Sequence, residues 1–365
     1  MGQTQGPVSS RGGIMILALE LVVMIVALVV IHELGHFITA KLFGVKVNEF
    51  GIGFPPKLFG WKKGETEYTL NSIPLGGFVK LEGETNPSQP RSLANKKPYI
   101  RLIILGSGSF MNALLALIIF TGLFMTPRDV SIGNVIIQEV STNSPAQLAG
   151  LLPGDEVVYV NEREINSIGS IRDNTYRNLG SEITITVQRN QILKQITLTP
   201  RWNPPTGEGP TGIKLALENA RTIQQSYPIW KAIPKATVEI QNVLFFTWHA
   251  LLQWVIGEAP FPGSGPVGIV KGTQEVVSIA GITALIPIAA LLSISLAVFN
   301  MLPIPSLDGG RSLFALVEWI RGGKRISPEK EGLFHMMGFA ILIAIIIAIS
   351  YNDVLRIIRG DSFIR

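Results

Sequence analysis

The stretch IMILALELVVMIVALVVIHELGH, residues 14–36, decides how this chain is built. Residues 14–31 are apolar except for Glu20, and a run of 18 such residues is long enough for a membrane-spanning helix. The run is not followed by a small-residue cleavage site, as a signal peptide would be, but continues into His32-Glu33-Leu34-Gly35-His36. The sequence therefore predicts that this pentapeptide lies within or beside a transmembrane helix.

The composition also indicates a membrane protein. Of the 365 residues, 47% are hydrophobic and 16% are charged, whereas soluble domains carry about 25% charged residues. Residues 102–125, 279–302 and 334–349 are further apolar runs and predict three more spans. The chain has no cysteine, which excludes disulfides, thiolate metal sites and a cysteine nucleophile. A bound metal would need nitrogen and oxygen ligands.

The distribution of charge orients these spans. Residues 41–101 hold 10 Lys/Arg and 5 acidic residues, residues 311–330 hold 5 and 2, and residues 126–220 hold 8 and 10. Positive loops stay in the cytoplasm, so the first two segments are predicted to be cytoplasmic. The third segment and both termini are then extracytoplasmic. The net charge of +5 is explained by this topology and not by binding of nucleic acid.

The extracytoplasmic segment has the pattern of a folded, β-rich domain. Residues 135–140, 156–160, 182–187 and 192–199 predict strands, the last two forming a hairpin. Ser144 followed by Pro145 predicts a helix start, and Gly150 fits the position after its end. Residues 203–212 contain three prolines and three glycines and predict a linker. Residues 229–256, which include Trp248 and Trp254, predict a helix at the membrane interface.

The HExxH pattern is the first candidate for chemistry. Its two histidines are four residues apart, so they lie on one face of a helix and their imidazoles converge on one metal ion. Zinc fits nitrogen and oxygen ligands, and Glu33 is then placed to take a proton from a water molecule. The alternative is a helix end whose histidines make ordinary polar contacts. Ionisable residues within a span are costly and usually functional, which favours the metal site.

A zinc site needs a third protein ligand. The segment NMLPIPSLDGG, residues 300–310, ends the third predicted span and so reaches the same cytoplasmic side as HELGH. Its prolines break the helix, and irregular backbone at this depth is tolerated where it lines a cavity. Asp308, followed by Gly309 and Gly310, is therefore the candidate ligand. Taken alone, this aspartate is better explained by an Asx turn after a helix end.

The two motifs together resemble those of the site-2 protease family of intramembrane zinc metalloproteases, HExxH and NxxPxPxxDG. The resemblance implies that His32, His36 and Asp308 bind one Zn²⁺ ion and that Glu33 is the catalytic base. Asn300 matches the family asparagine that helps to hold the substrate or the transition state.

Further segments resemble the bacterial branch of the family, of the RseP and RasP type, which cleaves anti-sigma factors. Residues 50–56 resemble its GFGP-like segment, and residues 265–269 its GPxxI segment. Residues 68–70 and 78–81, on either side of Pro74-Leu75-Gly76-Gly77, resemble its membrane-re-entrant β-hairpin. Residues 135–161 resemble a bacterial PDZ domain. The best-studied members of the branch carry two PDZ domains, whereas this chain has room for one.

The predicted fold is an α-helical polytopic membrane protein with four transmembrane helices, a membrane-re-entrant β-hairpin and one inserted β-rich PDZ domain. Its predicted boundaries are an N-terminal tail at 1–13, a first half of the membrane core at 14–125 with the hairpin at about 66–84, a PDZ domain at 126–202, a linker and interfacial amphipathic helix at 203–278, a second half of the core at 279–352 and a C-terminal tail at 353–365.

The resemblance implies regulated intramembrane proteolysis in a bacterial inner or plasma membrane. The implied substrates are transmembrane segments of single-pass proteins, such as anti-sigma factors after a first cleavage, or remnant signal peptides. An unwound substrate would add as a strand to the hairpin, with Tyr68, Gly76, Gly77 and Phe78 as substrate-binding residues. The PDZ domain either binds a peptide or new C-terminus or excludes substrates that are uncut.

Three ionisable residues are assigned no catalytic role. His249 is interpreted as interfacial packing, His335 as a boundary residue of the fourth span, and Glu20 as a satisfied or snorkelling polar group. Two rival functions are a PDZ scaffold and a metal transporter. The scaffold gives no reason for Glu33, Asn300 and Asp308 to occur together, and the transporter needs polar residues through the full depth of the membrane.

Overall fold

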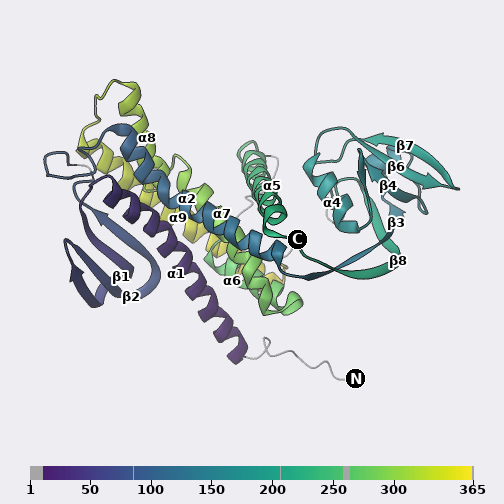
Figure 1. Ribbon diagram of the computed structural model, residues 1–365, viewed down its shortest axis with the longest axis horizontal. Coiled ribbons are helices and arrows are strands. Elements are labelled where there is room, and N and C mark those ends of the chain that lie inside the picture. Colours follow the sequence, from purple (N-terminus) through teal and green to yellow (C-terminus); the bar gives the residue numbers. More distant parts are fainter. Residues whose placement is uncertain (1–10, 85, 206, 258–263, 364–365) are drawn as a thin grey trace. The chain divides into compact units, whose positions relative to one another are not determined.

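The computed structural model describes residues 11–84, 86–205, 207–257 and 264–363. The chain divides into two compact units. One is Phe124–Pro228, and the other is formed by the two segments that flank it in the sequence (Figure 1). We describe the flanking segments as the membrane unit and Phe124–Pro228 as the β unit.

The membrane unit contains the predicted apolar helices. Among the described residues, α1 (Arg11–Leu42), α2 (Pro98–Met125), α7 (Leu285–Met301, preceded by a 3-10 turn at Ile282–Ala284) and α9 (Pro328–Arg359) give the stretches that are long and apolar enough to cross a membrane. The prediction of a polytopic membrane protein with four such helices is confirmed in these terms. Two shorter helices, α6 (Pro266–Ala280) and α8 (Asp308–Ile320), flank α7 in the sequence.

Both predicted tails are too long. Helix α1 begins at Arg11, so residues 11–13 are helical, whereas residues 1–10 lie outside the described residues. Helix α9 continues to Arg359, well past the predicted end of the span at residue 349. This extension contains Asp353, which is 2% exposed and accepts hydrogen bonds from the backbone N–H groups of Gly265 and Gly268 at 2.9 Å each. A polar residue that ends the apolar run thus fastens α9 to the start of α6.

The predicted linker and interfacial amphipathic helix at 203–278 contain more regular structure than expected. Residues 213–225 form a strand of the β unit, and α5 (Ile229–Val255) and α6 follow it. Helix α5 covers the predicted interfacial helix. Its Trp248 and Trp254 are both exposed, which suits the boundary between water and lipid.

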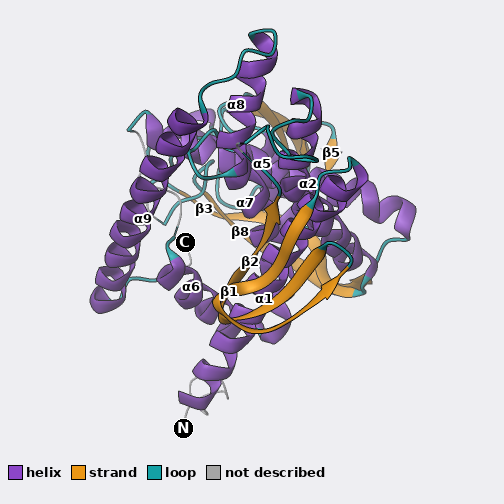
Figure 2. Ribbon diagram, turned by 90° about the vertical axis from the view of Figure 1, so that its left-hand side faces the viewer, coloured by secondary structure: helices purple, strands orange, loops and turns teal. Residues whose placement is uncertain are grey.

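The hairpin of the membrane unit is larger than predicted. Strand β1 (Val47–Lys63) pairs antiparallel with β2 (Thr66–Leu81), and the chain reverses at Gly64 with φ of 64°. The hairpin was predicted at about 66–84, with both arms there. In the structure both of these arms belong to one long strand, β2. Residues 77–81 pair with 47–52, residues 66–73 pair with 54–63, and residues 67–70 pair in addition with 49–52. The proline-glycine segment at 74–77 therefore lies inside β2. Figure 2 shows this ribbon lying beside α1.

The β unit is one antiparallel sheet with two short helices. The strands lie in the order β7-β6-β4-β3-β8, with β5 added to β4. In chain order the elements are β3 (Arg128–Val140), α3 (Pro145–Ala149), β4 (Glu156–Val160), β5 (Arg163–Glu164), α4 (Ile168–Arg177), β6 (Ile183–Arg189), β7 (Ile192–Leu198) and β8 (Ile213–Gln225).

Strand β8 was not predicted from the sequence, although it pairs with β3 along most of their lengths. Its second half, residues 218–225, carries polar residues on both faces, so it lacks the alternation that marks a half-buried strand.

The caps of α3 are as predicted. The Ser144 hydroxyl accepts from the N–H of Gln147 at 3.2 Å, and Gly150 ends the helix with φ of 86°.

One buried carboxylate joins the turn before β4 to the end of β6. Asp155 is 1% exposed and accepts from Nε and a terminal nitrogen of Arg189 at 2.6 Å each, and from the N–H of Leu152 at 2.9 Å. Burial alone would raise the pKa of Asp155, but these hydrogen bonds outweigh it and hold that pKa below its ordinary value.

Candidate metal centre

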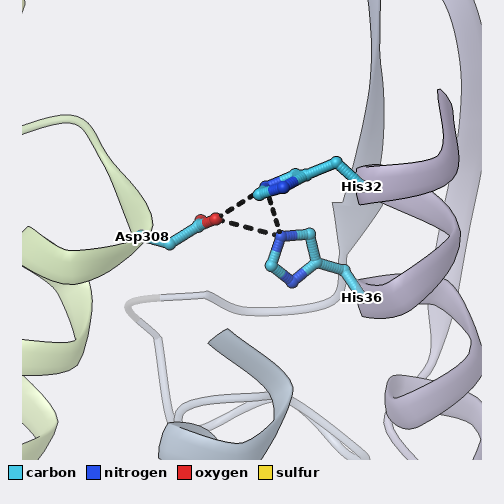
Figure 3. A group of neighbouring side chains, drawn as sticks. All are labelled: His32, His36 and Asp308. Carbon is cyan, nitrogen blue, oxygen red and sulfur yellow. Dashed lines mark hydrogen bonds and ion pairs between the residues drawn. The ribbon is translucent and has the colours of Figure 1, made fainter. Parts of the chain in front are cut away.

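The three predicted metal ligands meet at one point. His32 and His36 lie one turn apart on α1, and their Nε2 atoms are 3.2 Å from each other. Oδ2 of Asp308, the first residue of α8, lies 2.9 Å from Nε2 of His32 and 3.1 Å from Nε2 of His36 (Figure 3). Both histidines are buried, at 5% and 7% exposure. Asp308 is 276 positions from His32 and 272 from His36 in the sequence, yet the three residues form one cluster.

The approach of Asp308 depends on the two glycines that follow it. Helix α7 ends at Met301, and the loop 302–307 turns the chain into α8. A Cβ at Gly309 would lie 2.2 Å from the carbonyl oxygen of Leu302, and a Cβ at Gly310 would lie 2.3 Å from that of Ile304. No side chain fits at such distances, so glycine at both positions lets the start of α8 fold back on the loop.

Helix α8 is also fixed at its other end. Glu318 forms a buried ion pair with Arg101 of α2, and a second bond of 3.0 Å with Arg325. Arg101 lies one turn before Ile104, whose carbonyl oxygen accepts from Nδ1 of His36 at 2.8 Å. On α2, the residue that orients His36, Ile104, is therefore one turn from the residue that binds α8, Arg101.

The bond to Ile104 determines which nitrogen of His36 is available. Because Nδ1 donates to Ile104, Nε2 is the nitrogen of His36 that faces Asp308 and His32 and is left to bind a metal ion. Each ligand offers its metal-binding atom on the inner side of the cluster.

Helix α2 packs against the histidines through a glycine that the sequence reasoning missed. A Cβ at Gly108 would lie 2.5 Å from Nε2 of both His32 and His36. Gly35 makes the reciprocal approach, since a Cβ there would lie 2.4 Å from the carbonyl oxygen of Ser107. The signal that could have found this site is the polar segment GSGSFMN, residues 106–112, within an otherwise apolar span.

The same segment supplies Asn112, which the sequence reasoning also missed. It is fully buried, its Nδ2 lies 3.4 Å from Nδ1 of His32, and its Oδ1 has no partner among the described residues. A histidine that binds a metal through Nε2 keeps its proton on Nδ1 and needs an acceptor there. The amide of Asn112, turned by 180°, supplies that acceptor, and amide oxygen and nitrogen are assigned from such networks.

A cavity of about 290 Å³ opens beside the cluster. It is lined by residues from α1, α2, α7 and the loop before α8, namely Val29, His32, Glu33, Asn112, Leu296, Asn300, Ser306, Leu307 and Asp308. Glu33 and Asn300 are therefore in the same cavity as the three ligand candidates. The volume is sufficient for a segment of peptide and is far larger than one water molecule requires.

The predicted substrate residues lie on the hairpin at different distances from this cavity. A Cβ at Gly77 would lie 3.8 Å from Cγ of Glu33, and one at Gly76 would lie 3.4 Å from Cγ1 of Val29. Phe78 stacks on Phe54 with ring centroids 6.3 Å apart.

Tyr68 is not among the residues that line the cavity in the described part of the chain. Its ring stacks on Trp61 with centroids 5.3 Å apart. Its role in substrate binding stays a prediction.

The donor set and its spacing fit zinc. A tetrahedral zinc ion with bonds of about 2.0–2.1 Å holds its ligand atoms about 3.3 Å apart. The three ligand atoms here are separated by 2.9, 3.1 and 3.2 Å, so shifts of a few tenths of an ångström are sufficient. Two imidazoles and one carboxylate, with an open side toward a cavity, are the ligand set of a catalytic zinc site.

Two buried histidines of an HExxH motif on an apolar helix, with a carboxylate from the start of a distant helix beside them, define the class of membrane metallopeptidases. Comparison with known proteins gives the family. The model of Peptidase family M50 matches residues 20–345. A putative zinc metalloprotease of Clostridium perfringens is 37% identical over 332 residues, which are 90% of this chain and 96% of that protein.

A zinc metalloprotease RasP of Oceanobacillus iheyensis is 29% identical, with 92% of this chain and 98% of that protein covered. This chain therefore belongs to Peptidase family M50, and it is a zinc metalloprotease of the membrane.

Proposed function

We propose that this protein cleaves the transmembrane segments of single-pass membrane proteins, with His32, His36 and Asp308 as ligands of one zinc ion. The observation that carries the proposal is the convergence of these three side chains at a buried point on an apolar helix. A protease whose ligands lie within the span acts on peptide bonds at that depth. Anti-sigma factors after a first cleavage and remnant signal peptides are substrates of this kind.

The chemistry divides between the metal and the residues of the cavity. Zinc, when bound, polarises a peptide carbonyl and lowers the pKa of water to about 7. Glu33 lines the cavity next to His32 and is the group that accepts the proton of the attacking water and passes it to the leaving amine. Asn300 faces the same cavity, and its side-chain amide is suited to donate a hydrogen bond to the substrate carbonyl oxygen.

A substrate helix hides its carbonyl groups in its own hydrogen bonds and must unwind before cleavage. The second half of β2 is suited to receive the unwound segment. Residues 77–81 pair with β1, and the backbone of Val79 makes a hydrogen bond to the carboxylate of Glu33. An extended substrate added along this strand would lie next to the catalytic base. We assign Gly76, Gly77 and Phe78 to substrate binding on this ground, and we include Tyr68 because the hairpin that carries it resembles the re-entrant hairpin of the family.

We propose that the β unit is a single PDZ domain in an extracytoplasmic position, with the metal centre toward the cytoplasm. The charge asymmetry of the loops and the order of strands and helices, which resembles a bacterial PDZ domain, support this. The domain either recruits a peptide or excludes uncut substrates. Deletion of residues 126–225 separates the two roles, because recruitment predicts loss of cleavage and exclusion predicts cleavage of uncut precursors.

The replacement Glu33→Gln tests the proposed function. The variant keeps the size of the side chain and all three ligands, so it should hold about one equivalent of zinc. Its rate of cleavage should fall by about 10²- to 10⁴-fold, the usual contribution of a general base. The measurement is hydrolysis of a single-pass substrate in lipid bilayers, together with zinc content by mass spectrometry.

Glu20→Gln is the matched control. It makes the same chemical change on the same helix, twelve residues before His32, and should leave the rate of cleavage unaltered. Proteolysis at the normal rate by the Glu33→Gln variant would show that the assignment of the base is wrong. The same variant provides a stable complex from which bound substrates can be identified.

A further inference from the structure

The loop that carries Asp308 contains one residue in an unfavourable backbone conformation. Ser306 has φ of +75°, a left-handed conformation that residues with a side chain rarely adopt. It lies two residues before Asp308 and lines the cavity of the metal centre. Such a conformation persists only where the surrounding structure determines it, so we looked for the groups that hold Ser306.

Two hydrogen bonds to one residue of α9 hold Ser306 in this conformation. The backbone N–H of Ser306 donates to Nδ1 of His335 at 2.9 Å, and its hydroxyl donates to the backbone carbonyl of His335 at 2.5 Å. One turn later on α9, a Cβ at Gly338 would lie 1.9 Å from Cβ of Pro305. The backbone of α9 therefore approaches the loop as closely as is possible, and His335 and Gly338 hold Pro305 and Ser306 from the same side.

The protonation of His335 follows from these bonds. Because Nδ1 accepts a hydrogen bond, the proton of the neutral ring is on Nε2. Nε2 is buried and has no hydrogen-bond partner within the described residues. The ring lies against Phe314 of α8, with centroids 5.5 Å apart, and against Phe334 of α9, at 5.8 Å.

An apolar side chain would fill this position without leaving an N–H group unpaired. A buried, unpaired Nε2–H of His335 costs free energy of folding. We infer that histidine stands here because its other nitrogen, Nδ1, accepts the hydrogen bond from Ser306. The sequence interpretation of His335 as a boundary residue of the fourth span does not explain this contact.

We propose that His335 is a positioning residue for the metal centre. It holds Ser306 in the left-handed conformation that directs the chain into α8, and thereby sets the place of Asp308 opposite His32 and His36. The inference rests on the proposed role of Asp308 as a zinc ligand. His335 is outside the cluster of His32, His36 and Asp308, and it is not among the described residues that line the cavity, so its proposed effect on the metal centre passes through Ser306.

The test compares two polar replacements that differ in where they place an acceptor. Asn at position 335 puts an amide oxygen close to the place of Nδ1, whereas Gln reaches toward the place of Nε2. His335→Asn should keep the zinc affinity within about threefold of the normal value, and His335→Gln should lower it by about 10- to 100-fold, the range for groups that orient metal ligands. Zinc affinity is measured by competition with a chelator on the full chain in detergent.

Two further readouts separate positioning from a general loss of structure. Hydrogen exchange of residues 303–308 in the zinc-free protein should accelerate in His335→Gln and not in His335→Asn. His335→Gln should lower kcat with little change in KM, because the hairpin proposed to receive the substrate is intact, and His335→Asn should alter neither value. Met336→Leu, at an exposed neighbouring position on α9, is the matched control and should behave as the normal protein.

A second comparison uses the backbone. Glycine adopts φ of +75° without strain, so Ser306→Gly should restore part of the zinc affinity lost in His335→Gln. Equal zinc affinity of the Asn and Gln variants, whether normal or reduced, would overturn the proposal. Asp308→Asn distinguishes this failure from failure of the metal site. If Asp308→Asn retained zinc, the proposed function would be wrong, whatever the result at position 335.

Discussion

Replacement of Gly108 by alanine tests the packing of α2 on the metal centre. The new methyl group would lie 2.5 Å from Nε2 of both His32 and His36, and ordinary contact begins at 3.4 Å. The rings or the helix must therefore move by about 0.9 Å to accommodate one carbon atom. The contact is with the two metal-binding nitrogen atoms, so any movement alters the ligand geometry directly.

This displacement is large compared with what a zinc site tolerates. Metal–ligand distances in functional sites vary by about 0.2 Å, and a misplacement of about 1 Å in an active site can lower a rate by about 10²-fold. We expect Gly108→Ala to lower both zinc affinity and kcat/KM by about 10²-fold. Overpacking by one methyl group costs about 1–3 kcal/mol, so the protein should remain folded.

The assay is a chelator competition for zinc and the initial rate of substrate cleavage, both on purified protein in detergent. Gly106→Ala is the matched control, two residues away on the same helix, because a Cβ there meets no described atom within 4 Å. Normal zinc affinity and activity in Gly108→Ala would refute the steric argument. A similar loss in Gly106→Ala would show that the effect comes from the helix backbone and not from the contact with the histidines.

Two further predictions concern a buried amide and a buried carboxylate. Asn112→Leu removes the side-chain amide beside Nδ1 of His32 and should lower zinc affinity by about 10- to 100-fold. Chelator competition measures this affinity, and an unchanged value would exclude a role of Asn112 in orienting the imidazole of His32. Asp155 has a lowered pKa in the folded β unit, so its stabilising effect is complete above its unfolded pKa of about 3.9 and is lost as pH falls toward the folded pKa. Thermal unfolding followed by circular dichroism should therefore show a loss of stability below about pH 4 that is smaller in Asp155→Asn, and identical pH profiles would contradict this.

Much of the membrane core can be predicted from the sequence, because its signals are local. A run of apolar residues is sufficient to predict a spanning helix, and the spacing of four between His32 and His36 is sufficient to place both on one face. Asp308 became the candidate third ligand because its segment ends the third predicted span on the same side as HELGH and because the two motifs together resemble those of the site-2 proteases. These predictions needed no knowledge of how one helix packs on another.

The partners of the histidines could not be predicted in this way. Helix α2 is apolar on nearly all sides, so its periodicity does not indicate which face meets α1. Gly108 and Asn112 acquire their importance from the rotation of α2 about its own axis, which only packing determines. The same holds for β8, whose pairing with β3 gives it a role that its own composition does not indicate.

His335 marks the same division most clearly. By sequence it is a histidine at the start of an apolar run, and that position is explained by the boundary of the membrane. The tertiary structure brings it to Ser306, 29 residues earlier in the chain. The sequence alone predicted the candidate ligands, because the residue types and local spacing of His32 and His36 limit the chemistry and because the motif around Asp308 completes a known pair. Only the tertiary structure decided which groups hold those ligands in place, because such contacts join segments whose approach no local pattern encodes.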